Sequence, residues 1–459
     1  MADALKYLPE SYYTRYLSEG AKSRKPSPIR GLFPLEATPG VLSLLAGKPN
    51  EETFPFTSMN FAVRSPLDHS VDIPITLSPA QLAKGLQYSE TGGIPALCAW
   101  LNAFQERVHG RKAHGEGWRL SVGSGSQDLI YKACTALIDP GDSMLVETPC
   151  YAGVIPIFQG LHANMVEVDA DAHGIKSSTL RTILENWPQD KPKPKVLYTV
   201  PYGGNPTGMT ASLERRKEVL ELARIHEFII LEGKSFEFFS AKLRTDLTVP
   251  DDPYYFLYYG DHPRYPSYFE LEQQEPEVGR VLRFDSFSKI LSAGIRIGFV
   301  SGPAPLVQAI DMHTASANLQ TASLTQVIVA ALLEKWGFET FITHTEYVSA
   351  FYRRRRDVYN AAMEKYLTGL AEWDSPEAGM FFWFKLKIKE GEEDSESVIR
   401  TKAFEKGVIA LPGTSFIPLG AKTAFVRASF SIIKEEDIEE SVRRLRDAIL
   451  EARKEAGVV

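Results

Sequence analysis

The sequence predicts an α/β protein in which a mostly parallel sheet, sandwiched by helices, precedes a smaller α+β unit. Two observations lead to this fold class. Between about Leu120 and Pro303, short β-rich runs alternate with helical stretches, a pattern typical of parallel sheets with helices on both faces. From about Ala330 onward, long amphipathic helices with a few strands replace that alternation.

The expected strands of the sheet are short runs rich in apolar and β-branched residues: Arg119–Val122, Met144–Glu147, Met165–Val168, Val196–Val200, Phe228–Glu232, Arg280–Phe284 and Ile297–Ser301. Helices are expected between them, including Gln127–Leu137 and Leu213–His226. The first of these ends before Asp139-Pro140-Gly141, a combination that stops helices. In the smaller unit, Phe381–Leu386 and Ala424–Phe430 are expected strands. Ligands of such sheets bind at the carboxyl ends of strands.

A chain of 459 residues is too long for one small core, and we expect three segments. Residues 1–75 are expected to form an N-terminal arm, residues 76–328 a large domain and residues 329–459 a small C-terminal domain. The first forty residues are polar and punctuated by Pro26 and Pro28. We therefore expect this arm to lie on another surface instead of forming its own core.

Composition argues against several classes of partner. The net charge of −7 disfavours nucleic acid and anionic membrane surfaces. The three cysteines are odd in number and form no C-x-x-C pair, which indicates neither a disulfide framework nor a metal site. Residues 1–20 lack the apolar core of a signal peptide, and no apolar run is long enough to span a bilayer. We expect a cytoplasmic protein.

A candidate reactive lysine stands just past one expected strand. The polar segment Asp285–Lys289 follows the apolar run Val281–Phe284. Burial at a strand end would lower the pKa of Lys289 and make its amine nucleophilic toward an aldehyde. Donors suited to a phosphate stand nearby: Ser286, Ser288 and Arg296. The alternative is a surface lysine in a polar loop, and the neighbouring donors favour the reactive group.

Three other segments carry polar groups that suit a ligand. Gly123–Asp128 opens an expected helix, whose N–H groups and dipole attract anions, although such turns are common. Asn205, within Tyr202–Gly208, could donate to a ligand oxygen, although Asn-Pro and Thr-Gly also form plain turns. Asp251, within Asp251–Tyr254, could stabilise a protonated pyridine nitrogen, although adjacent acids also form solvated turns.

The order of these motifs resembles that of fold-type-I aminotransferases that depend on pyridoxal 5′-phosphate (PLP). More narrowly, the chain resembles the branch that holds fungal aromatic amino acid aminotransferases and the kynurenine/2-aminoadipate aminotransferases. The resemblance runs through nearly the whole chain and includes Pro26–Arg30, Ala46–Asn50 and the segment from Leu86 to Pro95. The combination is specific, although no single motif is.

The resemblance implies a role for each motif residue. Lys289 would hold PLP as a Schiff base and shuttle a proton between the substrate Cα and the cofactor C4′. Asp251 would pair with the pyridine nitrogen, while Asn205 and Tyr254 would bond the phenolic oxygen. Tyr151 would stack on the ring. The implied phosphate ligands are Ser126, Gln127, Ser286, Ser288 and Arg296, with Tyr88 reaching the phosphate of a neighbouring subunit.

The resemblance also implies the substrates. Arg427 would bind the substrate α-carboxylate, because its planar fork offers two parallel hydrogen bonds. Gly47 and Arg30 would lie on the arm that covers the substrate. The implied reaction moves the amino group of tryptophan, phenylalanine or tyrosine to 2-oxoglutarate or an aromatic 2-oxo acid, in a homodimer with shared active sites. Arg30 could instead bind the distal carboxylate of 2-aminoadipate, or be an exposed arm residue.

The sequence departs from the family pattern at one place. The family continues from its strand into Glu-Asp-Asp-Pro-Tyr, whereas here residues 233–250 separate Glu232 from Asp251 and add 18 residues (250 − 232). Our hypothesis is a retained intron, because Gly233-Lys234-Ser235 can be encoded by GGTAAGTCN, which holds a 5′ splice consensus. A true surface loop is the alternative. If the segment is translated, we expect weaker PLP binding and lower activity, because it lies where the strand must deliver Asp251.

Three other function classes remain open from the sequence. A PLP-binding transcription regulator would carry an N-terminal DNA-binding domain, for which too few residues precede the arm, and would suit the acidic charge poorly. A PLP-dependent lyase would use the same cofactor without forming glutamate from 2-oxoglutarate. An aminotransferase homologue impaired by residues 233–250 would bind PLP poorly.

Overall fold

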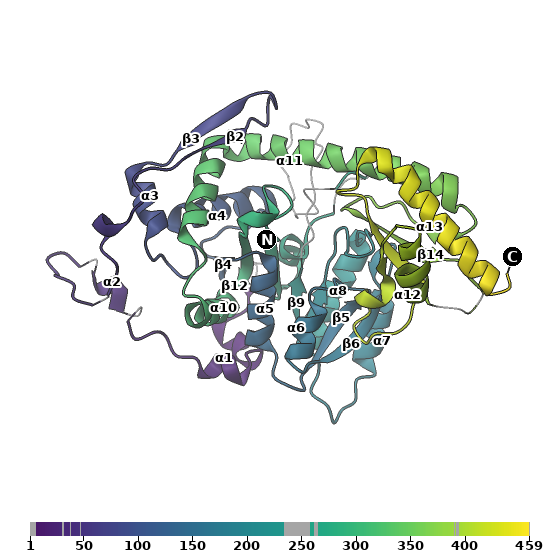
Figure 1. Cartoon of the computed structure of the whole chain (residues 1–459). Coiled ribbons are helices and arrows are strands. Elements are labelled where there is room, and N and C mark those ends of the chain that lie inside the picture. Colours follow the sequence, from purple (N-terminus) through teal and green to yellow (C-terminus); the bar gives the residue numbers. More distant parts are fainter. Residues whose placement is uncertain are drawn as a thin grey trace. The chain divides into compact units, whose positions relative to one another are not determined.

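The computed structural model describes residues 6–29, 32–36, 38–45, 47–233, 258–260, 265–389, 391 and 394–458 (Figure 1). The chain divides into two compact units. The first comprises residues 1–141 and 269–344, and the second comprises residues 142–268 and 345–459. The domain boundaries expected from the sequence stay predictions.

Three strands of the first unit lie in the order β4 (Trp118–Gly123), β12 (Gly298–Pro303) and β11 (Val281–Ser286). Strand β12 is antiparallel to both neighbours, and Gly298 pairs with Gly123 on one side and with Ser286 on the other. Nearly every residue of the three strands is buried, including the polar residues Ser121, Arg283 and Asp285. The carboxyl ends of β4 and β11 therefore meet beside the start of β12.

Two helices cover these strands. Helix α5 (Ser126–Leu137) follows β4, and α10 (Ala304–Ala317) follows β12. They pack against each other and against the strands. The remaining elements of this unit are α1 (Glu19–Ser23), α2 (Phe33–Glu36), α3 (Pro79–Leu86), α4 (Pro95–His109), η1 (Glu10–Arg15), η3 (Glu51–Thr53), η5 (Glu272–Gln274), η6 (Ala293–Ile295) and the strand pairs β1 (Lys6–Tyr7) with β10 (Glu277–Val278) and β2 (Asn60–Arg64) with β3 (Asp72–Thr76).

The start of the expected arm packs on its own unit. Tyr13 and Tyr16 are buried, and the Ser18 N–H donates to the Ala136 carbonyl of α5 over 2.8 Å. Tyr13, Tyr16 and Ser18 are thus buried against the first unit, whereas the other residues between 6 and 23 are at least partly exposed. The expectation that the arm lies on another surface stays a prediction. Farther along, large apolar side chains are exposed at Leu35, Leu42 and Leu44.

The second unit contains the parallel strands. They lie in the order β9 (Ile229–Glu232), β8 (Val196–Thr199), β5 (Ser143–Thr148) and β6 (Asn164–Asp171), and each pair of neighbours is parallel. Strand β7 (Gly174–Ile175) adds an antiparallel edge to β6. Between the strands, the chain forms α6 (Ile155–Gly160), α7 (Ser177–Glu185) and α8 (Leu213–His226). This alternation confirms the expected parallel α/β arrangement.

The carboxyl-terminal part of the second unit is an antiparallel sheet with helices. Its strand order is β13 (Ala371–Trp373), β14 (Phe381–Leu386), β16 (Phe425–Ser429) and β15 (Leu411–Pro412). Its helical elements are α12 (Ser395–Ser397), η7 (Val398–Ala403), η8 (Gly413–Phe416) and α13 (Glu435–Glu455). Buried residues from β14, β16 and α13 form one core, with Phe382, Val426 and Ile449 among its fully buried members. Two elements span the sequence boundaries of the units: α9 (Tyr268–Leu271) and α11 (Ser323–Leu367), which is interrupted at Gly337.

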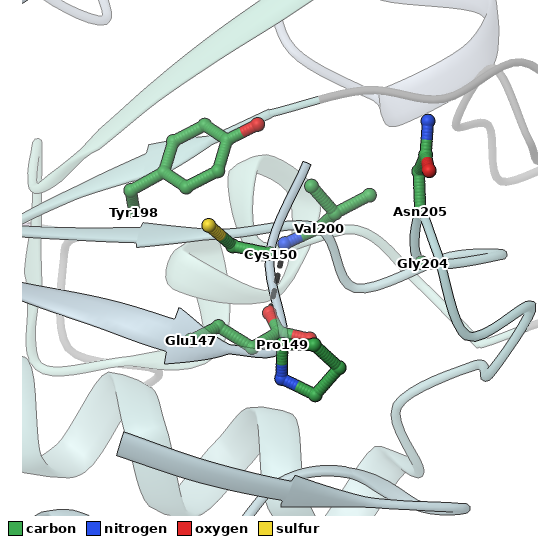
Figure 2. A pocket seen from close by; sticks show the side chains of 7 residues that line it. All are labelled: Glu147, Pro149, Cys150, Tyr198, Val200, Gly204 and Asn205. Carbon is green, nitrogen blue, oxygen red and sulfur yellow. Dashed lines mark hydrogen bonds between the residues drawn. The ribbon is translucent and has the colours of Figure 1, made fainter. Parts of the chain in front are cut away.

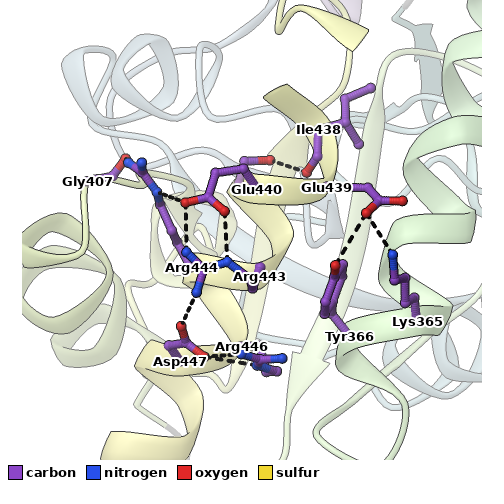
Figure 3. A network of polar contacts seen from close by, with 11 residues as sticks. Lys365, Tyr366, Gly407, Ile438, Glu439, Glu440, Arg443, Arg444, Arg446 and Asp447 are labelled. Carbon is purple, nitrogen blue, oxygen red and sulfur yellow. Dashed lines mark hydrogen bonds and ion pairs between the residues drawn. The ribbon is translucent and has the colours of Figure 1, made fainter. Parts of the chain in front are cut away.

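Ion pairs line the outer face of α13 (Figure 3). Arg443 bonds Glu440 and Asp447, three residues before it and four after it, and Arg444 shares Glu440. Lys365 of α11 reaches Glu439 over 2.7 Å. Exposed pairs of this kind stabilise a protein by only about 0–1 kcal/mol each, so this face contributes mainly to solubility.

Among the described residues, every helix is either too short or too polar to cross a membrane.

Candidate active site

The residues predicted from the sequence fall into two groups, one in each unit. The first unit holds Gly47, Tyr88, Ser126, Gln127, Ser286, Ser288, Lys289 and Arg296. The second holds Tyr151, Asn205 and Arg427. Three predicted residues lie outside the described residues: Arg30, Asp251 and Tyr254. Most of residues 233–250, where the intron is hypothesised, also lie outside them.

The start of α5 forms one wall of a polar cradle. The helix begins at Ser126 after Gly125, which has a φ of 89° and gives no side-chain cap to the first turn. Only glycine adopts this backbone conformation without strain. A Cβ at position 125 would also clash with the Arg296 guanidinium, which donates from Nη2 to the Ser124 carbonyl over 3.1 Å. Glycine is therefore required for the arginine to reach the helix start.

The turn after β11 forms the opposite wall. The Ser286 hydroxyl donates to the Ser288 hydroxyl over 3.0 Å, and Arg296 Nη1 donates to the same Ser288 oxygen over 2.9 Å. Arg296 itself has a φ of 49°, a left-handed conformation that is uncommon for residues other than glycine. At Gly298, a Cβ would lie 2.7 Å from the Ser126 N atom. The strand ends thus approach closely enough to surround one small group.

This cradle fits the phosphate of PLP. Four of the predicted phosphate ligands, Ser126, Ser286, Ser288 and Arg296, meet here, and Gln127 follows in the first turn of α5. The donor set combines hydroxyls, a guanidinium and the positive end of a twelve-residue helix. Such groups favour a dianion because the N–H groups and the helix dipole both present positive charge to it.

Lys289 follows Ser288 directly, in the turn after β11. Its side chain is exposed, whereas burial was expected to lower its pKa. The difference arises because the residue stands in the turn, three positions beyond the buried end of the strand. Lys289 nevertheless borders the cradle in sequence and has the flexible stem that a covalent attachment needs.

The structure does not connect Tyr88 or Gly47 with the cradle. Tyr88 is half exposed, and its backbone N–H donates to the Gln87 side chain over 3.0 Å. Around Gly47, nothing lies within 4 Å of where a Cβ would be. Among the described residues, neither residue forms a hydrogen bond with a cradle residue. Their implied roles therefore stay predictions.

In the second unit, Asn205 and Arg427 are in direct contact. Arg427 Nη1 donates to Asn205 Oδ1 over 2.9 Å. Arg427 lies in the middle of β16, where it pairs with Trp383 of β14 and Leu411 of β15. Two phenyl rings, those of Phe381 and Phe416, lie 4.0 and 4.9 Å from its guanidinium carbon. The rings hold the planar cation in a fixed orientation.

Tyr151 follows Cys150, one of the residues that line a narrow pocket. Gly153 packs so closely on the Tyr151 ring that a Cβ would clash with it, which fixes the ring's position. The pocket is lined by Glu147, Pro149, Cys150, Tyr198, Val200, Gly204 and Asn205 (Figure 2). These residues come from the ends of β5 and β8 and from the segments after them, as expected for a site at the carboxyl edge of parallel strands.

Glu147 is a pocket residue that sequence reasoning missed as a functional group. It is 3% exposed and accepts hydrogen bonds from the Thr199 hydroxyl and, over 2.9 Å, from the Val200 N–H. Burial raises its pKa to about 7, and these two hydrogen bonds oppose the rise. The available signal was an acidic residue directly after the apolar run Met144–Val146.

Comparisons with known proteins agree with this geometry. The family model described as aminotransferase class I and II matches residues 80–445. The chain is 39% identical over 439 residues to aminotransferase tdiD of Emericella nidulans, with 94% of each chain covered. It is 38% identical over 454 residues to the mitochondrial kynurenine/alpha-aminoadipate aminotransferase of Bos taurus, covering 96% of this chain and 99% of that one.

Among solved structures, the aromatic aminotransferase Aro9 from Candida albicans matches with a TM-score of 0.81 at 27% identity, covering 97% of this chain and 99% of that chain. The family model spans well over half of the chain, and the relatives match almost its full length. The chain therefore belongs to the aminotransferase class I and II family: it is an aminotransferase of fold type I whose cofactor is pyridoxal 5′-phosphate.

Proposed function

We propose that the enzyme transfers the amino group of an aromatic amino acid, such as tryptophan, phenylalanine or tyrosine, to 2-oxoglutarate or to an aromatic 2-oxo acid. The observation that carries this proposal is the aromatic setting of Arg427, between Phe381 and Phe416. A substrate whose carboxylate binds Arg427 would place its side chain near phenyl rings, which favour another aromatic ring. The name of the similar Candida albicans aminotransferase supports the same substrate class.

In this proposal, Arg427 binds the α-carboxylate through two parallel hydrogen bonds. Asn205, whose oxygen faces Arg427, offers its amide N–H groups to the cofactor's phenolic oxygen. Tyr151 lies against the cofactor ring, and the cradle of Ser126, Gln127, Ser286, Ser288 and Arg296 binds the phosphate. Tyr254 would add a second bond to the phenolic oxygen.

When bound, PLP supplies an electron sink for breaking the Cα–H bond and holds the amino group between the two half-reactions. Lys289 would hold the cofactor through its Nζ atom and, once displaced by substrate, would carry a proton from the substrate Cα to the cofactor C4′. Asp251 would keep the pyridine nitrogen protonated, because a carboxylate beside it favours the cationic ring. The protein's own work is thus binding, orientation and one proton transfer.

We also propose a homodimer in which Tyr88 reaches the phosphate of the other subunit. Its half-exposed ring and the exposed leucines at positions 35, 42 and 44 support this, because large apolar side chains that face solvent mark interaction surfaces. Gly47 and Arg30 would lie on the segment that covers the substrate. The expected cytoplasmic location stays a prediction, and the similar bovine enzyme is mitochondrial by name.

A panel of amino donors with 2-oxoglutarate tests the proposal through glutamate formation. We expect tryptophan, phenylalanine and tyrosine to give higher kcat/KM values than 2-aminoadipate or kynurenine. Higher kcat/KM values for 2-aminoadipate and kynurenine would overturn the proposal. They would favour the second candidate function, a kynurenine/2-aminoadipate aminotransferase, which the name of the bovine relative supports. Consumption of the amino acid without glutamate would indicate a lyase.

A further inference from the structure

We propose that Lys132 neutralises Asp128 behind the phosphate cradle, and that this compensation lets the first turn of α5 bind a dianion. The proposal rests on the assignment of the cradle to the PLP phosphate. Neither residue touches the phosphate in this scheme, so both are positioning residues and not ligands.

The two side chains form an ion pair one helical turn apart on α5. Lys132 Nζ lies 2.9 Å from Asp128 Oδ2, and the two side chains are 3% and 24% exposed. The same Nζ donates to Asn318 Oδ1, at the end of α10, over 3.1 Å. A buried ammonium with two oxygen acceptors is held in place and is screened little by salt.

Asp128 connects this pair to the cradle loop. Its Oδ2 atom accepts the Ser124 N–H over 3.0 Å, and the carbonyl of the same Ser124 accepts from Arg296 over 3.1 Å. Ser124 is therefore held from both sides, immediately before the glycine that starts the helix. Asp128 thus orders the loop that presents the first-turn N–H groups of α5.

This ordering carries an electrostatic penalty for an anionic ligand. Asp128 is the third residue of α5 and lies in the turn whose positive end would face the phosphate. A carboxylate there suits the helix dipole, but it repels a dianion bound to the same turn. Cancelling that charge requires a cation on the far side of the carboxylate, which is the position of Lys132.

Two neighbouring ionisable groups, His313 and Asp311, do not supply the missing charge. Burial lowers the pKa of His313 to about 4, so that side chain is neutral at pH 7. Asp311 is negative when ionised, and it is bonded to Arg119 and, over 2.5 Å, to Ser121. Lys132 is the cation that the structure pairs directly with Asp128, over 2.9 Å.

Charge compensation predicts in which direction PLP affinity changes in each variant, whereas loop ordering alone does not. Lys132→Gln leaves a partly buried carboxylate uncompensated behind the cradle, so PLP affinity should fall by about tenfold or more. Asp128→Asn keeps an oxygen acceptor for the Ser124 N–H and removes the negative charge, so PLP affinity should be no weaker than in the unaltered enzyme. The double variant Asp128→Asn/Lys132→Gln should bind PLP more tightly than Lys132→Gln alone.

The experiment titrates PLP, and pyridoxal without phosphate, into the full-length cofactor-free enzyme and follows the visible absorbance of the bound cofactor. Lys132→Gln should weaken PLP binding while changing pyridoxal binding less than about twofold, because only PLP carries the charge. Lys132→Arg keeps the positive charge and should retain PLP affinity. If Lys132→Gln does not fold, the comparison of Lys132→Arg and Asp128→Asn with the unaltered enzyme still decides.

The matched control is the partly buried pair Asp142–Lys195, whose Nζ and Oδ2 atoms lie 2.6 Å apart in the second unit. Asp142→Asn/Lys195→Gln should leave the preference for PLP over pyridoxal unchanged. If the unaltered enzyme bound pyridoxal as tightly as PLP, the cradle assignment itself would be wrong. A different result would refute only the charge compensation and leave the cradle assignment intact. In that result, the unaltered enzyme prefers PLP over pyridoxal, but Asp128→Asn/Lys132→Gln binds PLP no better than Lys132→Gln.

Discussion

Arg427 donates a hydrogen bond from Nη1 to Asn205 Oδ1 over 2.9 Å, and this contact determines which way the Asn205 amide faces. A guanidinium has donors only, so the amide oxygen must face it. The amide nitrogen is then the end that remains to donate to a ligand oxygen. One contact therefore links the proposed grip on the substrate carboxylate to the proposed contact with the cofactor.

Replacing Arg427 with lysine tests the carboxylate grip. Lysine keeps the charge but cannot form two parallel hydrogen bonds, a loss worth about 2–3 kcal/mol or roughly 100-fold in binding. We therefore expect KM for the amino acid to rise by about that factor with a smaller change in kcat. An amine substrate analogue without the carboxylate serves as the control and should react equally with both enzymes. An unchanged KM for the amino acid would contradict the assignment.

Substituting Gly125 with alanine should damage the cradle. The residue has a φ of 89°, and a Cβ would clash with Arg296. Gly141 has the same φ of 89° with nothing within 4 Å, so Gly141→Ala isolates the backbone strain. Both variants should lose about 1–2 kcal/mol of stability to that strain, and only Gly125→Ala should bind PLP about tenfold or more weakly. Equal PLP affinities in the two variants would count against the proposed role of Arg296.

Glu147 should make stability fall as pH rises toward neutrality. Its pKa is raised from 4.5 to about 7, chiefly by burial. Below the lower value both folded and unfolded chains keep the proton. Between the two values the unfolded chain releases a proton that the folded chain retains, so the free energy of unfolding decreases as pH rises. Above pH 7 the decrease levels off at about 3 kcal/mol, an order-of-magnitude figure.

The Glu147→Gln variant removes this ionisation and keeps an oxygen to accept from Thr199 and Val200. The melting temperature of the variant minus that of the unaltered enzyme should be larger at pH 8 than at pH 5. Thermal melts at both pH values measure this directly. An identical pH dependence in the two proteins would show that the carboxyl ionises normally.

Deleting residues 233–250 should improve the enzyme. The deletion rejoins Glu232 to Asp251 and restores the spacing of the family pattern. Errors near 1 Å at a reacting centre can reduce rates by about 100-fold, so we expect tighter PLP binding and a higher kcat. Equal activity and cofactor affinity in both proteins would refute the expected impairment. The intron hypothesis has its own test: it would be refuted if no transcript carries a junction that joins Glu232 to Asp252 through a single Asp codon.

Long periodic elements were predictable from the sequence. The expected strand Phe381–Leu386 and helix Leu213–His226 have the bounds of β14 and α8, because strong patterns and helix-ending residues determine them locally. The two-residue strands β1 and β10 were missed, since each exists only by pairing with the other across the chain. The break at Gly337 within α11 was also missed, because a glycine in a helical pattern is often tolerated.

For the candidate site, the sequence indicated which residues could bind the phosphate, but not which neighbouring residues hold them in place. The structure brings Ser126, Ser288 and Arg296 together, and their role as phosphate ligands stays a prediction. The pair Asp128–Lys132 behind them resembles any helical ion pair in sequence. The burial of Lys132 and its bond to Asn318 depend on how α10 packs on α5, which spacing does not encode.

The most direct test of the whole account is covalent trapping of the cofactor. Purified enzyme loaded with PLP is reduced with borohydride and digested, and the modified peptide is identified by mass spectrometry. We predict a phosphopyridoxyl adduct on Lys289, abolished in Lys289→Ala and retained in Lys234→Ala. An adduct on another lysine, or none at all, would contradict the assignment of Lys289 as the residue that holds the cofactor.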